Sequence, residues 1–132
     1  NLSHSGNKVV LIVDERPVGV DVELITTYSQ SAAKKVFTTV EQNWLRCQAT
    51  DEAFFRLWTG KEAIMKALGL GFHLPPESFE ICPDAGIPNI VGGRSWYLHW
   101  LTLDHHIICT AAEHPGRPTM PILLSRNELL QK

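Results

Sequence analysis

The sequence predicts an α+β fold, in which an antiparallel sheet packs against one long helix and two shorter helices. Three observations support this prediction. Valine-rich segments with turn residues between them open the chain, apolar residues at helical spacing occupy its middle, and alternating β-branched and aromatic residues return after residue 94. At 132 residues the chain has the length of one domain, so we expect residues 1–132 to form a single domain.

The first 25 residues are expected to hold a polar turn and two strands. Residues 1–7 (NLSHSGN) have the composition of a turn. Residues 8–14 and 17–25 are rich in valine and isoleucine, and the sequence DERP between them is typical of a tight connection. We therefore expect these two strands to lie next to each other.

Three helices are predicted next, over residues 29–37, 39–47 and 51–69. Thr38 and Glu41 have the spacing of a capping box at the start of the second helix. The third helix has acidic residues at its start and Gly69 at its end, as helices prefer. Its apolar positions follow the i, i+3, i+4 spacing: Phe54, Leu57, Trp58, Ile64, Met65 and Leu68.

The remainder is predicted to return to strands. A loop rich in glycine and proline leads to a short strand over residues 79–82. Residues 95–103 and 105–113 then form a second antiparallel pair, and residues 120–132 give a last short strand and a tail.

Composition argues against a nucleic-acid-binding or membrane protein. Net charge is −2, which gives no basic surface for nucleic acid, so we expect no nucleic-acid partner. The apolar runs are much shorter than a membrane span, so no membrane association is expected. Three scattered cysteines without a CxxC pair suit a reduced, cytoplasmic protein.

The stretch VGVDVE places two acids in a predicted strand. Because side chains alternate along a strand, Asp21 and Glu23 project to the same side, about 7 Å apart at the backbone. Two ionised carboxylates brought together repel each other, so a buried pair needs a cation. The alternative is that both acids face water on an edge strand, and this segment alone leaves both possibilities open.

The long helix carries a third carboxylate between lysines. Glu62 and Lys66 are four residues apart and share one face, and Lys61 flanks that face. Carboxylate oxygens with nearby lysines suit a Mg²⁺ site that binds phosphate groups, although an exposed face with a simple i, i+4 pair has the same spacing. Gly60 indicates that another group approaches the helix closely.

Taken in order, the motifs NLSHSG, VGVDVE and LWTGKEAIMKALGLG resemble those of the 4′-phosphopantetheinyl transferases of the surfactin-synthetase-activating (Sfp) type. The family pattern is a G-[IV]-D-x-E strand, some forty residues, and W-[ST]-x-K-E-[AS]-x-x-K. Glu62 lies 41 residues after Asp21 (62 − 21), which agrees with that spacing. The resemblance extends over essentially the whole chain and implies the fold of one half of such a transferase.

The resemblance implies an enzyme, a holo-[acyl-carrier-protein] synthase that transfers the 4′-phosphopantetheine arm of coenzyme A to a serine of an acyl or peptidyl carrier protein. Adenosine 3′,5′-bisphosphate would be released. By similarity, Asp21, Glu23 and Glu62 would hold Mg²⁺, or Mn²⁺ in its place, and Glu62 would act as the general base.

By the same similarity, coenzyme A would be bound by five residues. Asp21 would act through the metal ion at the pyrophosphate. Lys61 and Lys66 would contact the phosphates and stabilise the leaving group, with Lys66 a catalytic residue beside Glu62. Ser3 and His4 would contact the 3′-phosphate.

Carrier protein would dock on the helices that follow VGVDVE. Lys34 and Lys35 would attract an acidic partner, and the apolar part of the surface would come from Ile25, Tyr28, Val36 and Phe37.

Full-length enzymes of this type have two similar halves. The chain, which begins at Asn1, looks like the C-terminal half with the linker motif, so we expect the N-terminal half to be absent. A missing half or a second copy would then complete the site. Two alternatives stay open: a module that only binds carrier protein, and another Mg²⁺-dependent enzyme that cleaves phosphodiesters.

Overall fold

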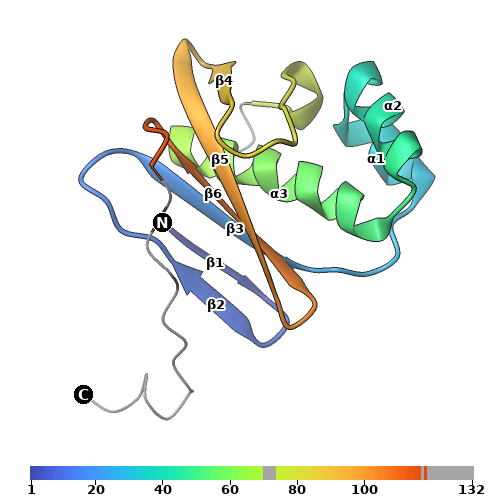
Figure 1. The fold of residues 1–132 in the computed structure, drawn as a ribbon, viewed down its shortest axis with the longest axis horizontal. Coiled ribbons are helices and arrows are strands. Elements are labelled where there is room, and N and C mark those ends of the chain that lie inside the picture. Colours follow the sequence, from blue (N-terminus) through green and yellow to red (C-terminus); the bar gives the residue numbers. More distant parts are fainter. Residues whose placement is uncertain (70–73, 117, 119–132) are drawn as a thin grey trace.

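The computed structural model describes residues 1–69, 74–116 and 118. Figure 1 shows an α+β arrangement, in which the helices lie to one side of a twisted antiparallel sheet and a small hairpin lies at its edge. The predicted fold class is confirmed. The described elements are β1 (Leu2–Ser5), β2 (Lys8–Leu11), β3 (Val18–Leu24), α1 (Gln30–Val36), α2 (Thr39–Gln48), α3 (Asp51–Leu68), the 3₁₀ helix η2 (Pro76–Ser78), β4 (Pro88–Val91), β5 (Arg94–Leu103) and β6 (His106–Ala112).

The described strands form two sheets. β1 and β2 make a two-stranded sheet, and the larger sheet has the order β3-β6-β5-β4 with antiparallel neighbours. β3 is therefore an edge strand, and its partner is β6, with Val18 opposite Ala112. The prediction that the strand over 8–14 would pair with the strand over 17–25 is wrong, because β2 pairs instead with β1.

The helix α3 packs directly on β3, and a glycine in VGVDVE makes this possible. A Cβ atom on Gly19 would lie 1.9 Å from the carbonyl oxygen of Ala63, so no other residue fits between strand and helix. At Gly60 a side chain approaches the helix closely, since a Cβ atom there would lie 2.6 Å from Cδ1 of Ile81. The close approach that was predicted at Gly60 is confirmed.

Hydrophobic clusters cover both faces of the larger sheet. Between the sheet and α3, the fully buried side chains include Leu57, Ile64, Leu98 and Ile107. On the opposite face, a smaller cluster consists of Val20, Val22 and Ile108, with Val10, Ile12 and Leu101 packed against it. Since successive residues of a strand face opposite sides, the acids that alternate with Val20 and Val22 face α3.

Most helix predictions are confirmed by the caps. α2 begins with the predicted capping box, in which Thr38 N donates to Glu41 Oε1 and Glu41 N donates to Thr38 Oγ1. α3 ends at Gly69, whose φ of 69° is left-handed and favours glycine.

Some strand predictions are confirmed and others are wrong. The pair over 95–103 and 105–113 is confirmed as β5 and β6. Residues 1–7 contain the strand β1 in place of a turn alone, residues 79–82 form no strand, and β4 was not predicted. The strand predicted within 120–132 lies outside the described residues. Within the described residues, no helix combines the length and apolarity needed to cross a bilayer.

Candidate active site

Three of the predicted site carboxylates lie near enough to one another, where α3 crosses β3, for their charges to interact. Asp21 and Glu23 lie on the side of β3 that faces the helix, and α3 contributes Glu62 and Lys66. Asp21 is almost fully buried, with 3% of its surface exposed, whereas Glu23 and Glu62 are partly buried. The fixed crossing of strand and helix at Gly19 therefore places these four side chains in one region.

The two oxygens of Asp21 have different surroundings. Oδ1 accepts a hydrogen bond from Lys66 Nζ at 3.0 Å and another from Ser3 Oγ at 3.1 Å. Oδ2 is inaccessible to water and has no hydrogen-bond partner among the described residues. Because leaving a buried carboxylate oxygen unpaired is unfavourable, Asp21 is an incompletely satisfied group in this state.

The pKa values of all three carboxyl groups are raised. For Glu23, burial together with the negative charges of Asp21 and Glu62 raises the pKa from 4.5 to about 7. Burial and the charge of Asp21 raise the pKa of Glu62, and burial raises the pKa of Asp21 despite the neighbouring Lys66 ammonium. The three acids therefore repel one another, and a single lysine does not compensate them.

The residue types here fit a hard divalent cation. Oxygen ligands from carboxylates are what Mg²⁺ prefers, and both the unpaired Oδ2 of Asp21 and the mutual repulsion would be relieved by added positive charge. Within residues 1–69, 74–116 and 118, no group of three or more Asp, Glu, His or Cys side chains is arranged so that it could hold a metal ion. The shared metal ion stays a prediction.

The structure corrects the role expected of Lys61. Its side chain is fully buried, and its three ammonium hydrogens meet Glu41 Oε1 at 2.8 Å, Pro76 O at 2.6 Å and Phe79 O at 2.5 Å. Burial lowers its pKa, and the charge of Glu41 opposes that effect. With every donor occupied, Lys61 has no hydrogen left for a phosphate of coenzyme A, and it instead joins α3 to α2 and to the segment around η2.

Ser3 and His4 have different surroundings. Ser3 is buried, and its hydroxyl donates to Asp21 and accepts from Val22 N at 3.1 Å. Its contact with the 3′-phosphate of coenzyme A stays a prediction. His4 is exposed on the other side of β1, and its contact with coenzyme A stays a prediction.

Comparison with known proteins supports the interpretation of this cluster. Residues 17–116 match the model of the 4′-phosphopantetheinyl transferase superfamily, a stretch that includes Asp21, Glu23, Glu62 and Lys66 but not Ser3 or His4. The chain belongs to the 4′-phosphopantetheinyl transferase superfamily.

Several members of the superfamily are similar along much of this chain. The 4′-phosphopantetheinyl transferase Sfp of Bacillus subtilis strain 168 is 30% identical over 98% of this chain and 62% of its own length. HetI of Nostoc sp. is 40% identical over 85% of this chain and 50% of its own. The gsp transferase of Aneurinibacillus migulanus is 39% identical over 61% of this chain and 35% of its own. The chain thus spans between about one third and two thirds of the length of these relatives.

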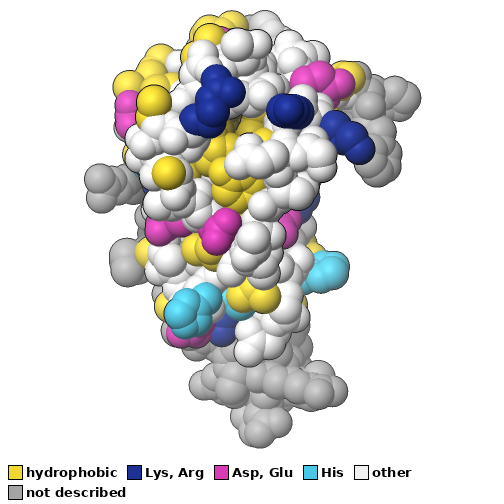
Figure 2. Space-filling model, turned by 90° about the vertical axis from the view of Figure 1, so that its right-hand side faces the viewer, with side chains coloured by type: hydrophobic (Ala, Val, Ile, Leu, Met, Phe, Trp, Pro, Cys, Tyr) yellow, Lys and Arg dark blue, Asp and Glu magenta, His cyan; other side chains and the backbone are white. Residues whose placement is uncertain are grey.

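Of the residues predicted to form the carrier-protein surface, some are exposed and others are largely buried. Phe37 is 2% exposed, and Tyr28 stacks on Phe54 at 4.7 Å between ring centroids, so both rings belong largely to the core. Lys34 and Lys35 are exposed in the last turn of α1. Figure 2 views the side on which α1 and α2 lie and shows Lys and Arg side chains bordering a hydrophobic area.

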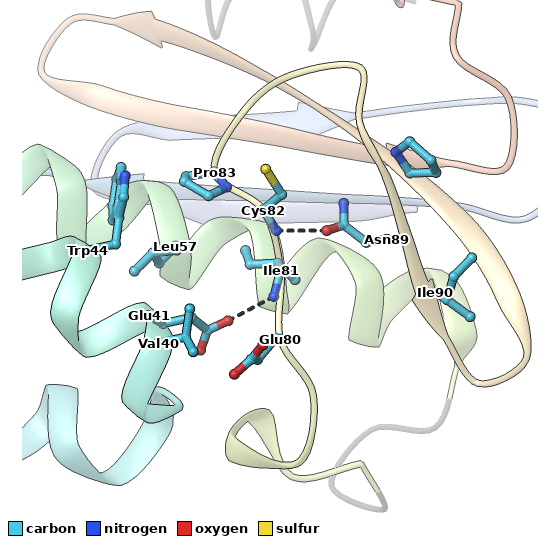
Figure 3. A pocket seen from close by; sticks show the side chains of 11 residues that line it. Val40, Glu41, Trp44, Leu57, Glu80, Ile81, Cys82, Pro83, Asn89 and Ile90 are labelled. Carbon is cyan, nitrogen blue, oxygen red and sulfur yellow. Dashed lines mark hydrogen bonds between the residues drawn. The ribbon is translucent and has the colours of Figure 1, made fainter.

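A hollow of about 420 Å³ lies elsewhere on this transferase-family domain, between α2, β4 and residues 80–83. Its walls are held by two hydrogen bonds that Figure 3 shows, from Ile81 N to Glu41 and from Cys82 N to Asn89 Oδ1. None of the site residues predicted from the sequence lines it, so the hollow is distinct from the acidic cluster.

Sequence reasoning missed the buried group formed by Lys61 and Glu41. A signal for Lys61 was present, because position 61 continues the apolar stripe of Phe54, Leu57, Trp58, Ile64 and Leu68 at i+3 and i+4 spacing. For Glu41, the capping box predicted one contact but gave no indication of its bonds to Lys61 and Ile81 N.

Proposed function

We propose that this chain carries out, or contributes the catalytic residues for, the Mg²⁺-dependent transfer of 4′-phosphopantetheine from coenzyme A to a serine of an acyl or peptidyl carrier protein. The proposal depends on one observation: the family match includes the three carboxylates and the lysine that meet at the crossing of β3 and α3. The relatives named above are 4′-phosphopantetheinyl transferases, which supports the reaction class.

Asp21, Glu23 and Glu62 would hold Mg²⁺, with Mn²⁺ as an alternative. The raised pKa values and the unpaired Oδ2 support this assignment, since both indicate a site that lacks positive charge. When bound, the ion would neutralise negative charge on the phosphate oxygens of coenzyme A.

The remaining chemistry is assigned to side chains of the cluster. The serine oxygen of the carrier would form a bond to the phosphorus that bears the pantetheine arm. The bond from that phosphorus to the bridging pyrophosphate oxygen would break, and adenosine 3′,5′-bisphosphate would leave with the electron pair. Glu62 would accept the serine proton as the general base. Lys66, whose ammonium is already in the cluster, would donate to the phosphate oxygens.

Binding outside the cluster is also part of the proposal. His4 would contact the 3′-phosphate of coenzyme A, and the exposed Lys34 and Lys35 would favour an acidic carrier protein in the cytoplasm. Because the relatives are longer than this chain, the rest of the coenzyme A cleft would come from a further polypeptide segment or from a second copy.

Intact-protein mass spectrometry tests the reaction directly. An apo-carrier protein is incubated with coenzyme A, Mg²⁺ and the chain, alone and together with the part of the Bacillus subtilis relative that this sequence does not match. We expect the carrier to gain the mass of the phosphopantetheine arm, and a chelator to abolish the gain. Glu62→Gln is expected to lower the rate by about 10²-fold or more, while Glu52→Gln, an exposed acid on the same helix, serves as the matched control.

Two other outcomes would replace the proposal. Carrier binding without any mass gain under all these conditions would indicate a binding module. Release of nucleotide from a phosphodiester, with the carrier unchanged, would indicate a phosphodiester-cleaving enzyme.

A further inference from the structure

The free edge of β3 is covered by the side chains of Asn1 and of two residues of β1, in place of a neighbouring backbone. Val20 N donates to Asn1 Oδ1 at 2.9 Å, Val22 N to Ser3 Oγ at 3.1 Å, and Leu24 N to Ser5 Oγ at 3.0 Å. Alternate residues from Asn1 to Ser5 therefore accept hydrogen bonds from the backbone N–H groups of alternate residues of β3. The polar residues of NLSHS thus act as a row of acceptors along the strand that carries Asp21 and Glu23.

Ser3 differs from Ser5 in this row, because its hydroxyl has a second contact. A serine hydroxyl has one hydrogen to donate and lone pairs to accept. Ser3 accepts from Val22 N and donates to Asp21 Oδ1 at 3.1 Å, and the residue is only 4% exposed. The two contacts together fix the direction of the hydroxyl. Because it accepts from the backbone of β3, its oxygen is held beside Asp21, to which it donates.

These contacts determine how the Asp21 carboxylate is held. Oδ1 is bonded from two directions, by Ser3 of β1 and by Lys66 of α3, whereas Oδ2 has no partner among the described residues. The donors on Oδ1 oppose rotation of the carboxylate, so the same oxygen stays bonded and the same oxygen stays free. Side chains that hydrogen-bond a metal-binding carboxylate orient it and tune its affinity in this way.

We infer that Ser3 is a positioning residue for Asp21, whose hydroxyl orients the carboxylate so that Oδ2 is reserved for a hard divalent cation. This inference rests on the proposed function, in which Asp21 is a metal ligand. It assigns Ser3 a role through Asp21 that is separate from the contact with coenzyme A implied by the family resemblance.

Mn²⁺ binding to the full chain tests the inference without requiring catalysis. Mn²⁺ is titrated into the wild type, Ser3→Ala and Ser5→Ala, and free Mn²⁺ is measured by electron paramagnetic resonance. Ser5→Ala is the matched control, since it removes the same kind of acceptor from the same row but touches no carboxylate in the described structure. We expect Ser3→Ala to weaken Mn²⁺ binding by about 10-fold or more and Ser5→Ala to change it by less than about twofold.

Circular dichroism and urea unfolding establish that each variant is folded. Ser3→Thr retains the hydroxyl and should restore most of the affinity, and Ser3→Cys fills the same buried space with a weaker donor should Ser3→Ala fail to fold. Equal Mn²⁺ affinity in the wild type and the Ser3 variants, or equal losses for Ser3→Ala and Ser5→Ala, would overturn the inference alone. Absence of Mn²⁺ uptake by the wild type would overturn the proposed metal site and the inference with it.

Discussion

Two lysines of α3 each pair with a carboxylate from another element, at nearly equal N–O distances but in different surroundings. Lys61 lies 2.8 Å from Glu41, and Lys66 lies 3.0 Å from Asp21. Around the first pair, the lysine hydrogens and the carboxylate oxygens all have partners. Around the second, one oxygen of Asp21 has no partner in the described part of the chain, and two further acids lie close by.

The difference teaches that distance alone does not distinguish a structural ion pair from a binding site. A buried pair stabilises a fold only when its remaining hydrogen-bonding groups are satisfied, as those of Lys61 and Glu41 are. The cluster at Asp21 is uncompensated, which is unfavourable for the domain by itself and favourable for binding a cation. We therefore expect changes at the first pair to affect stability and changes at the second to affect ligand binding.

The largest expected effect is that of Lys61→Met. It removes the ammonium that pairs with Glu41 and leaves the carbonyl groups of Pro76 and Phe79 without this donor. We expect the free energy of unfolding to fall by about 3–5 kcal/mol, measured by urea denaturation. Lys35→Met, at an exposed lysine, is the control and should change stability by less than about 0.5 kcal/mol. A loss below about 1 kcal/mol for Lys61→Met would contradict the structural role.

An intermediate effect is expected from pH in metal-free buffer. The pKa of Glu23 is raised from 4.5 to about 7 in the folded chain, so between these pH values the folded state holds a proton that the unfolded state lacks. Stability should therefore fall as pH rises from 4.5 to 7, by about 1–3 kcal/mol for this group. Asp21 and Glu62 act in the same direction.

Urea unfolding at pH 5, 6, 7 and 8 measures this dependence. Glu23→Gln should flatten the decline, because the amide does not titrate. Mg²⁺ that binds the folded state should raise stability most at the upper end of the range. A wild-type stability that is constant or rises from pH 5 to 7 would show that the acids are not mutually repelling.

The smallest expected change in stability is that of Lys66→Met. The Lys66 side chain is 29% exposed, and Asp21, whose pKa is already raised, can take up a proton once the ammonium is gone. We expect a loss of about 1 kcal/mol in the free energy of unfolding, together with a much larger loss in the rate of the phosphopantetheine transfer proposed above. A destabilisation as large as that of Lys61→Met would mean that both pairs are structural.

The helical part of the fold could be predicted from the sequence because its signals are local. The apolar stripe of α3, the Thr38–Glu41 capping box and Gly69 all act within a few residues, and the structure confirms each of them. Local signals could not show that Lys61 forms a buried structural ion pair while Lys66 belongs to the acidic cluster. Their difference arises from groups distant along the chain, namely Glu41 and Asp21.

The errors at β1 have a physical cause. Asn1, Ser3 and Ser5 have the composition of a turn, but they alternate with Leu2 and His4 and use their side chains as acceptors for the edge of β3. Nothing in the local sequence of residues 1–7 shows that such an edge would lie beside them. For the candidate site, spacing left the alternatives open, and it was the family resemblance that implied a shared region for Asp21, Glu23, Glu62 and Lys66. Which of their charges are compensated could be seen only from the three-dimensional contacts.

The pairing of β3 with β6 has a consequence for how the chain acquires its structure. Val18 is opposite Ala112, so the larger sheet closes only after nearly the whole described chain is available, whereas the three helices between these strands depend on local contacts. Contacts so distant in sequence slow folding. We expect α1, α2 and α3 to form early, on or near the ribosome, and the acidic strand to reach its final neighbours last.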